Sequence, residues 1–303
     1  MLMETKQANV PGIRIGSKLV GTGYPAYVIA EIGINHNGDI DLAKRLITVA
    51  VAAGCDAVKF QKRTVDVVYT PEELAKPREN PFGLTNGDLK RGLEFTYEEY
   101  QEINRYCAEV KMPWFASCWD EESVDFIAQF NPPCYKIASA SLTDDNLLRH
   151  TRAQGKPLLL STGMSTLEQI DHALEVLGKE DLILLHACST YPAYYEELNL
   201  NVIQTLRARY GIPVGYSGHE TGLPSSLVSV ALGACIVERH ITLDRSMWGS
   251  DQAASLEPNG ITRLVSYLRL VEKSMGDGVK RVLEREQPII HKLRRVGASS
   301  GQG

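Results

Sequence analysis

Polar side chains that can bind or react stand at the ends of apolar segments along this 303-residue sequence. The first such segment, 27–33, carries Glu31 near its end, and an Asn-His pair, an Asn-Gly turn and a helical pattern follow it. Later apolar segments end in the same way. The polar residues at these ends are Glu31, Lys59, Gln61, Ser117, Lys136, Ser139, Ser161, Thr162, Ser189, Tyr191, Ser217, His219, Glu238 and His240. Because every segment contributes at least one of them, they indicate one shared site.

Two of these residues are lysines, which are almost never buried without a partner. Lys59 and Lys136 would together form the positive floor of a cavity. An ammonium group is a compact charge that suits phosphate, and hydroxyl groups supply further donors. We therefore expect an anion cradle whose hydroxyl ligands are Ser139, Ser161, Ser189 and Ser217.

Two histidines end the last two apolar segments. His219 and His240 would lie side by side if these segments are neighbouring strands, and the pair could then hold a divalent metal ion with open positions for water or substrate. Each histidine alone could equally be a hydrogen-bonded core residue. Glu238, Arg239 and His240 follow one another on a strand, so one of them should point outward, and we expect Arg239 to be structural.

The sequence around these residues predicts eight units, each of which is a strand followed by a helix. Their strands are nearly continuous apolar runs, which is typical of parallel strands buried on both faces. The expected strands are 27–33, 56–62, 114–118, 134–139, 157–162, 182–188, 214–217 and 236–241. The helices that follow them are 41–53, 97–111, 121–129, 144–154, 166–178, 199–209, 223–233 and 260–275. Ser165 and Glu168 fit a capping box at one helix start.

This pattern predicts an α/β protein with a closed (β/α)8 TIM barrel spanning residues 1–278, followed by a tail at 279–303. The alternative is an open doubly wound sheet, which would normally carry a GxGxxG turn after a strand, and the sequence has none. Residues 64–96 are expected to form a long polar loop. In a barrel the active site lies where the carboxyl ends of the strands meet the following loops.

Composition and charge narrow the class of protein. The chain is 44% hydrophobic and 23% charged, with a formal net charge of −5, so neither nucleic acid nor an anionic membrane is expected as a partner. The six cysteines show no metal-ligand spacing, and several lie in apolar runs. We expect a cytoplasmic protein without structural disulfides, because the N-terminus has no apolar stretch of signal-peptide length.

Seven motifs, in order, closely resemble the sialic acid synthase (N-acetylneuraminate synthase) family. The motifs are residues 31–38 (EIGINHNG), 58–61 (VKFQ), 135–137 (YKI), 160–164 (LSTGM), 191–192 (YP), 215–219 (GYSGH) and 238–240 (ERH). The resemblance implies a (β/α)8 barrel that condenses phosphoenolpyruvate with an aldose, usually an N-acylated mannosamine. The products would be a 3-deoxy-2-ulosonic acid and phosphate. It also implies a divalent metal, often Mn²⁺ with Mg²⁺ or Co²⁺ possible, and a homodimer.

The resemblance also implies roles for single residues. Lys59, Lys136, Ser139, Ser161 and Ser217 match positions that hold phosphoenolpyruvate, and we add Ser189 to this group. His219 and His240 match the metal ligands, and Glu31 matches the catalytic acid/base. Gln61, Tyr191 and Asp251 match positions that contact the acceptor sugar.

The sequence also departs from the family pattern. Many members have Asp at 218, Asn at 189, Thr at 118 and Glu at 141, where this chain has Gly218, Ser189, Cys118 and Ser141. The family usually adds a C-terminal antifreeze-like domain, and this chain is expected to lack it. The acceptor is therefore less defined than the reaction type. We expect that Arg294 or Arg295 of the tail, or the loop 64–96, closes the site instead.

Three competing functions remain open from the sequence. One is a Schiff-base pyruvate aldolase that uses Lys136 or Lys59. A second is a related synthase with a phosphorylated or non-acylated aldose. A third is a non-catalytic scaffold of a sugar pathway, which would not need Glu31, two lysines and two histidines together.

Overall fold

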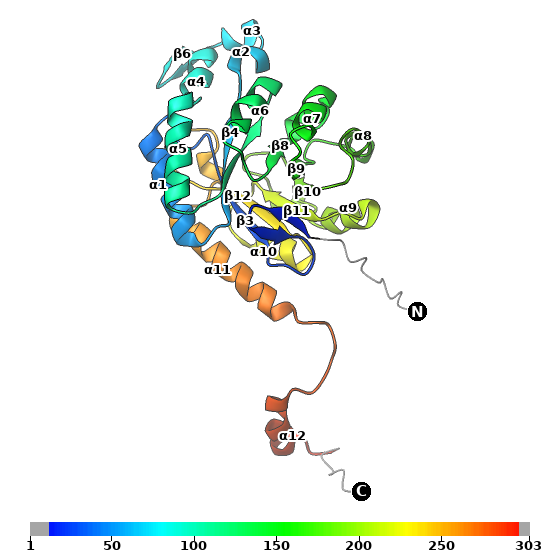
Figure 1. The fold of residues 1–303 in the computed structure, drawn as a ribbon. Coiled ribbons are helices and arrows are strands. Elements are labelled where there is room, and N and C mark those ends of the chain that lie inside the picture. The colour runs from blue at the N-terminus through cyan, green and yellow to red at the C-terminus, as the bar shows by residue number, and fades with distance from the viewer. Residues whose placement is uncertain (1–11, 297–303) are drawn as a thin grey trace.

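The computed structural model describes residues 12–296, and its central feature is a closed barrel of eight parallel strands (Figure 1). The strands, in sequence, are β3 (Tyr27–Gly33), β4 (Ala57–Lys62), β7 (Trp114–Cys118), β8 (Tyr135–Ile137), β9 (Leu158–Ser161), β10 (Leu182–Ala187), β11 (Val214–Gly218) and β12 (Ile236–His240). β12 pairs with β3 and closes the ring. The predicted barrel is confirmed, and an open sheet is excluded because no strand of the ring has a free edge.

Helices surround this ring, and each strand is followed by one of them. The main helices are α1 (Ile40–Ala53), α5 (Tyr97–Glu109), α6 (Glu121–Ala128), α7 (Asp145–Arg152), α8 (Leu167–Leu177), α9 (Val202–Tyr210), α10 (Pro224–Ala231) and α11 (Pro258–Met275). Every predicted strand–helix unit is present within a few residues of its expected bounds. The capping box of α8 was predicted one residue too early, because Thr166 and Gln169 form it in place of Ser165 and Glu168.

The interior of the barrel is apolar at one end only. A small antiparallel hairpin, β1 (Ile13–Ile15) and β2 (Lys18–Val20), packs its buried residues against the inward side chains of the strands. These inward side chains include Ile29, Phe115 and Leu185, none of which is exposed. The amino-terminal end of the barrel is therefore filled, and a cavity can form only towards the carboxyl ends of the strands.

The expected loop 64–96 has structure of its own. It contains α2 (Val65–Val68), α3 (Pro71–Leu74), a hairpin of β5 (Pro77–Asn80) and β6 (Gly83–Thr85), and α4 (Asn86–Gly92). This subdomain follows β4 and lies at the top of the view in Figure 1. Phe82 packs edge-on against Trp248, with ring centroids 6.5 Å apart, so the hairpin touches the loop that follows β12.

The segment after α11 extends away from the barrel and ends in a short helix, α12 (Gln287–Leu293), at the opposite end of the molecule from the 64–96 subdomain (Figure 1). Arg294 and Arg295 follow directly after α12. Four further short 3-10 turns occur at Ser139–Ser141, Tyr195–Glu197, Gln252–Ala254 and Glu284–Glu286. Among the described residues, no helix has the length and apolar character needed to cross a membrane.

Candidate active site

A cavity of about 160 Å³ opens at the carboxyl ends of the barrel strands. All eight strands, or the loops directly after them, contribute to its wall. The polar side chains that line it are Glu31, Lys59, Gln61, Ser117, Trp119, Lys136, Ser139, Ser161, Ser189, Tyr191, Ser217, His219, Glu238 and His240. With the exceptions of Thr162 and Asp251, every predicted site residue lines this one cavity.

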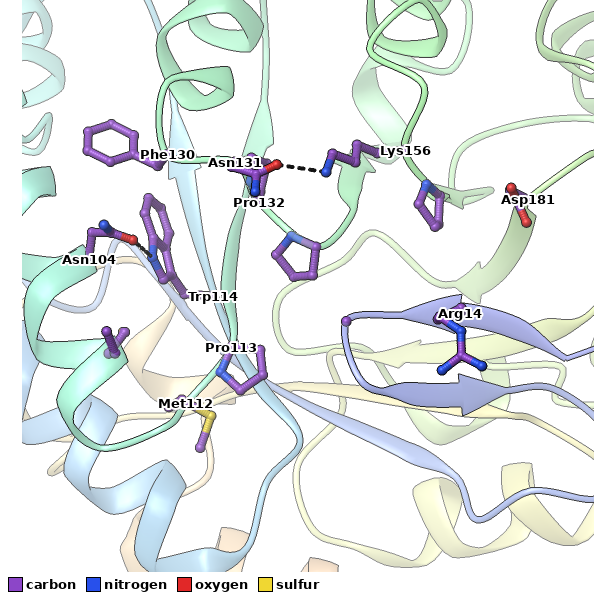
Figure 2. Close-up of a pocket in the computed structure, with 15 residues that line it drawn as sticks. Arg14, Asn104, Met112, Pro113, Trp114, Phe130, Asn131, Pro132, Lys156 and Asp181 are labelled. Carbon is purple, nitrogen blue, oxygen red and sulfur yellow. Dashed lines mark hydrogen bonds between the residues drawn. The ribbon is translucent and has the colours of Figure 1, made fainter.

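A larger groove, of about 610 Å³, lies at the other end of the barrel (Figure 2). Its wall is formed by residues that precede strands, and several polar groups there are already paired. The Trp114 indole donates to Asn104 over 3.0 Å, and the Lys156 ammonium donates to Asn131 over 2.7 Å. Because residues at this end of a barrel serve stability, we place the candidate active site in the smaller cavity.

A buried ion cluster occupies the floor of the cavity. The Lys59 ammonium lies 3.3 Å from Glu31 Oε2 and 3.0 Å from Glu238 Oε1. All three side chains are almost fully buried. Although burial alone would lower the pKa of Lys59, the two carboxylates raise it, so this ammonium stays charged.

The two carboxylates of this cluster differ in their pKa. Burial raises the pKa of Glu31, although Lys59 and His240 oppose that rise. Burial would also raise the pKa of Glu238, but Lys59 and Lys136 lower it to about 2. Neighbouring carboxylates whose pKa values are driven apart are a common arrangement of acid/base sites. Glu31 is thus the one suited to take up and release a proton, while Glu238 remains a fixed negative charge.

Among residues 12–296, Lys136 has no carboxylate partner of its own. Its ammonium is buried at 3% exposure, and its hydrogen bond goes to the backbone carbonyl of Ile137, over 3.2 Å. Burial and the nearby Lys59 lower the pKa of Lys136 to about 8. An ammonium has three donors, so this group is positioned to receive an anion from the cavity.

Hydroxyl groups line the same cavity as that ammonium. The Gly163 amide donates to Ser139 Oγ over 3.0 Å, and the backbone of Gly163 passes close to both Ser139 and Ser189. A Cβ at position 163 would lie 2.2 Å from Ser189 Oγ and 2.8 Å from Ser139 Oγ, which explains the glycine. Ser117 Oγ is buried and makes no hydrogen bond among the described residues. The arrangement supplies several donors to an anion held by Lys136.

Ser217 departs from its expected role as a phosphate ligand. Its hydroxyl donates to Glu238 Oε1 over 2.9 Å, so the hydroxyl is engaged by the ion cluster. It lines the same cavity as the other three predicted serines. We read its main contribution as support for the ionised form of Glu238, because a hydrogen bond to a carboxylate favours its charged state.

The two histidines lie side by side, with ring centroids 5.6 Å apart. His219 Nδ1 faces the Cys188 carbonyl, which fixes the proton on Nδ1 and leaves a lone pair on Nε2, and the Tyr191 hydroxyl lies 2.8 Å from that nitrogen. Burial and the neighbouring His240 lower the pKa of His219 to about 3, so it is neutral, as a metal ligand must be. His240 Nδ1 is buried and makes no hydrogen bond within the part of the chain that the structure describes.

These features fit a divalent ion held by two imidazoles, because the two rings lie 5.6 Å apart between centroids and His219 is neutral. Within residues 12–296, no group of three or more His, Cys, Asp or Glu side chains is arranged to hold a metal ion. The protein would therefore supply two ligands, and the other positions of the ion would be left to water or substrate. 

The three residues expected to contact the acceptor have different surroundings. Gln61 donates to Glu31 Oε1 over 3.0 Å, and Tyr191 stacks on His219 with centroids 4.1 Å apart. Asp251 does not line the cavity, and its Oδ2 lies 3.8 Å from His240 Nδ1. Gln61 and Tyr191 can thus contact a bound molecule, while Asp251 lies beside the histidine pair.

Sequence reasoning placed Glu238 among the strand-end residues but gave it no role, although it belongs to the ion cluster. The signal was available, because residues 238 and 240 have the same parity on a strand and therefore face the same side. Arg239, as predicted, points outward and is structural. It lies 3.1 Å from Glu220 and donates to Ser226 of α10 over 2.9 Å. Trp119, just beyond the end of β7, was also missed.

Glu220 also explains the glycine at 218. A Cβ there would lie 2.7 Å from Glu220 Oε2 and 3.0 Å from the Arg239 side chain. A carboxylate side chain at 218 would have no room in this chain. Glu220 fills the space and neutralises the buried guanidinium.

The sequence of this chain is similar to those of known proteins. A model described as the NeuB family matches residues 46–280. Human N-acetylneuraminate-9-phosphate synthase is 39% identical over 279 residues, which are 90% of this chain and 78% of that protein. N,N'-diacetyllegionaminic acid synthase of Legionella pneumophila is 34% identical over 290 residues, 92% of this chain and 82% of that protein.

A solved structure agrees with these sequence relatives. It is the N-acetylneuraminic acid (sialic acid) synthetase of Leptospira borgpetersenii serovar Hardjo-bovis in complex with citrate. That structure has a TM-score of 0.83 and 30% identity, and the match covers 94% of this chain and 98% of that one. The resemblance carried by the seven motifs is confirmed, and the chain belongs to the NeuB family.

Proposed function

We propose that this protein is a sialic-acid-type synthase, a C–C bond-forming transferase that condenses phosphoenolpyruvate with an aldose and releases phosphate. The observation that carries the proposal is the buried Lys136 ammonium, which has no carboxylate partner among the described residues and lines a cavity together with several hydroxyl groups. Such a group favours a small dianion. Relatives named for the synthesis of N-acetylneuraminate 9-phosphate and N,N'-diacetyllegionaminic acid support an acceptor of the amino-sugar class.

The proposed roles follow from the geometry of the cavity. Lys136, with Ser139, Ser161 and Ser189, binds the phosphate and carboxylate of phosphoenolpyruvate. Lys59 adds a second positive charge and stays protonated because two carboxylates flank it. Holding both ends of the molecule in line is chiefly a positioning contribution.

Bond making and bond breaking can then be assigned. The methylene carbon of phosphoenolpyruvate attacks the aldehyde carbon of the acceptor, and the protonated Glu31 carboxyl gives its proton to the aldehyde oxygen, which becomes a hydroxyl. Water adds to the resulting cationic C2 and returns a proton to Glu31. The bond between C2 and the bridging oxygen then breaks, phosphate leaves with that oxygen and with the proton of the new C2 hydroxyl, and C2 becomes a ketone. Glu31 lies at the floor of the cavity, where its raised pKa suits proton transfer.

We further propose a divalent ion, Mn²⁺ before Mg²⁺ or Co²⁺, between His219 and His240. When bound there it would supply Lewis-acid polarisation of the acceptor's aldehyde oxygen. His219 and His240 would hold the ion through their ring nitrogens, and Tyr191 would contact the acceptor beside them. Calorimetric titration with Mn²⁺ should show a site in the wild type that the H240A variant lacks.

The decisive experiment measures phosphate release from phosphoenolpyruvate in the presence of Mn²⁺. The aldoses to be compared are N-acetylmannosamine, its 6-phosphate, free hexoses, bacillosamine-derived sugars and phosphorylated pentoses. We expect release with one of these classes only. Phosphoenolpyruvate labelled with ¹⁸O at the bridging position should yield labelled phosphate. Failure of every aldose together with failure to bind phosphoenolpyruvate would overturn the proposal.

One observation favours a second function, a Schiff-base pyruvate aldolase. With its pKa lowered to about 8, Lys136 has a larger neutral fraction near pH 7 than an ordinary lysine, as an amine nucleophile requires. Borohydride in the presence of pyruvate would trap the aldolase covalently at Lys136. The synthase predicts no trapping, because a bound dianion keeps this ammonium protonated.

A further inference from the structure

Arg63 is a buried cation just outside the cavity. It follows β4, is 8% exposed, and does not itself line the cavity wall. Its Nη1 donates to Glu94 Oε1 over 3.4 Å, and its backbone amide donates to Glu94 Oε2 over 3.1 Å. Its guanidinium lies 4.4 Å from the ring centroid of Trp119, which does line the cavity. Three contacts of different kinds therefore hold Arg63 in one position.

The Arg63 guanidinium also orients Gln61. Its Nη2 donates to Gln61 Oε1, while Gln61 Nε2 donates to Glu31 Oε1 over 3.0 Å. A guanidinium can only donate and a carboxylate can only accept. The amide of Gln61 therefore has one satisfactory orientation, with its oxygen towards Arg63 and its nitrogen towards Glu31. A run of donors and acceptors links Glu94, through Arg63 and Gln61, to the proposed acid/base.

This arrangement assigns different roles to the two oxygens of Glu31. Oε1 accepts from Gln61, while Oε2 is buried, makes no hydrogen bond among the described residues and lies 3.3 Å from Lys59. Oε1 is therefore tied to Gln61, whereas Oε2 faces the ion cluster. Gln61, held by Arg63, would keep the carboxyl group in position through the proton transfer.

We propose that Arg63 is a positioning residue, which acts through Gln61 to orient the Glu31 carboxyl group. The reaction assigned to Glu31 rests on the proposed function, whereas the orientation of its carboxyl group does not. The charged and titratable groups that face Glu31 are Lys59 of β4 and Glu238 and His240 of β12. Those that face Arg63 are Glu94 and His36.

The direction of the effect follows from the hydrogen bonds. Without Arg63, the Gln61 amide can turn its oxygen towards Glu31, which disfavours the ionised carboxylate. Loss of the hydrogen bond from Gln61 would also raise the pKa of Glu31, because that bond stabilises the ionised carboxylate. The pKa of Glu31 should therefore rise, and the acidic limb of the pH profile of kcat should move to higher pH.

The test compares Arg63→Met with Arg105→Met, which removes an exposed arginine paired with Glu102 on α5. For R63M we expect the acidic limb to move up by about one pH unit. We also expect kcat below that limb to fall roughly 10- to 100-fold, the usual effect of removing a partner of a reacting group. KM for phosphoenolpyruvate should stay near the wild-type value, because the lysines and serines are untouched. R105M should match the wild type.

Titration of the glutamate carboxyl carbons by ¹³C NMR, with E31Q to assign the signal, provides a readout that needs no turnover. An upward shift of the Glu31 pKa in R63M would support the relay even if phosphoenolpyruvate proved not to be the substrate. Should R63M fail to fold, Glu94→Gln should move the same pKa in the same direction, by less. An unchanged Glu31 pKa, or kcat lowered equally at every pH with a lower melting temperature, would overturn the proposal and leave Arg63 structural.

Discussion

Lys136 is buried in the cavity, and within the described part of the chain its hydrogen bond goes to a backbone carbonyl rather than to a carboxylate. Glu31 and Glu238, by contrast, both lie within 3.3 Å of Lys59. Two lysines of similar burial therefore differ in whether carboxylates neutralise their charge. Lys59 belongs to a neutralised cluster, while Lys136 is available to an anionic substrate.

This difference predicts how substrate binding depends on pH. As the pH rises through about 8, the free Lys136 ammonium loses its proton, so KM for phosphoenolpyruvate should increase by about tenfold per further pH unit. Steady-state kinetics from pH 6 to 10 would measure this. Lys136→Met should raise KM roughly 30-fold or more at pH 7 and remove the pH dependence. A wild-type KM that stays flat to pH 10 would contradict the assignment of Lys136.

Substitution of Glu31 should lower the rate of catalysis without weakening the binding of phosphoenolpyruvate. In Glu31→Gln the amide cannot take up a proton, so kcat should fall roughly 10²- to 10⁴-fold while KM for phosphoenolpyruvate changes little. Glu238 still neutralises Lys59 in this variant. Glu102→Gln, on the exposed surface of α5, is the matched control and should leave kcat unchanged. A fully active E31Q enzyme would show that the proton goes elsewhere.

At the scale of elements, the close approach of loops decides whether the anion site can form. The loop after β9 passes between the hydroxyls of the β8 and β10 loops, and only a glycine at 163 allows this. The hairpin of the 64–96 subdomain similarly packs Phe82 against Trp248. Loops from five strands are thus held against one another rather than left free.

Gly163→Ala tests this packing. The added methyl group would displace Ser189 and Ser139, so KM for phosphoenolpyruvate should rise, and the stability should fall by about 1–3 kcal/mol. Gly260→Ala is the control, since a Cβ at this position of α11 meets its nearest neighbour at an ordinary 3.4 Å. That variant should be neutral or slightly more stable. Urea unfolding would measure the stability of both proteins, and steady-state kinetics would measure their KM values. Equal KM values would contradict the proposed anion site around Gly163.

At the scale of the whole molecule, the C-terminal segment carries apolar side chains that its own barrel does not cover. Val282, Leu283, Ile289 and Leu293 are all at least 50% exposed, as are Leu270 and Met275 on α11. Exposed apolar surface of this extent is typical of a protein interface. We therefore propose that the protein is a homodimer in which these residues contact a second copy.

Removal of residues 288–303 should weaken that dimer. Sedimentation velocity at matched protein concentration should show a dimer for the full chain and a smaller species for the truncated one. Phosphate release by the truncated chain would be measured in parallel, to test the expectation that Arg294 or Arg295 closes a site. Unchanged kinetics would show that the tail does not close the site. The 64–96 subdomain would then remain as the segment expected to close it. A full-length monomer would contradict the dimer proposal.

The amino-acid sequence by itself determined the barrel and most of its cavity. Uninterrupted apolar runs separated by amphipathic helices can be buried on both faces only in a parallel sheet, and parallel strands bring their carboxyl ends together. The positions of Lys59, Lys136, His219 and His240 therefore predicted one site. The bounds of the strands could be predicted as well, because each apolar run ends before the helical spacing of apolar residues begins.

Only the tertiary structure decided the contacts between groups far apart in sequence. Lys59 selects Glu238, 179 positions away, because β4 and β12 both flank β3 in the closed ring. Ser217 turns to Glu238, Asp251 stands beside His240, and Arg63 reaches Gln61 together with Glu94. Sequence spacing does not determine such pairs, because they depend on strand register and on which side chains share the same buried space.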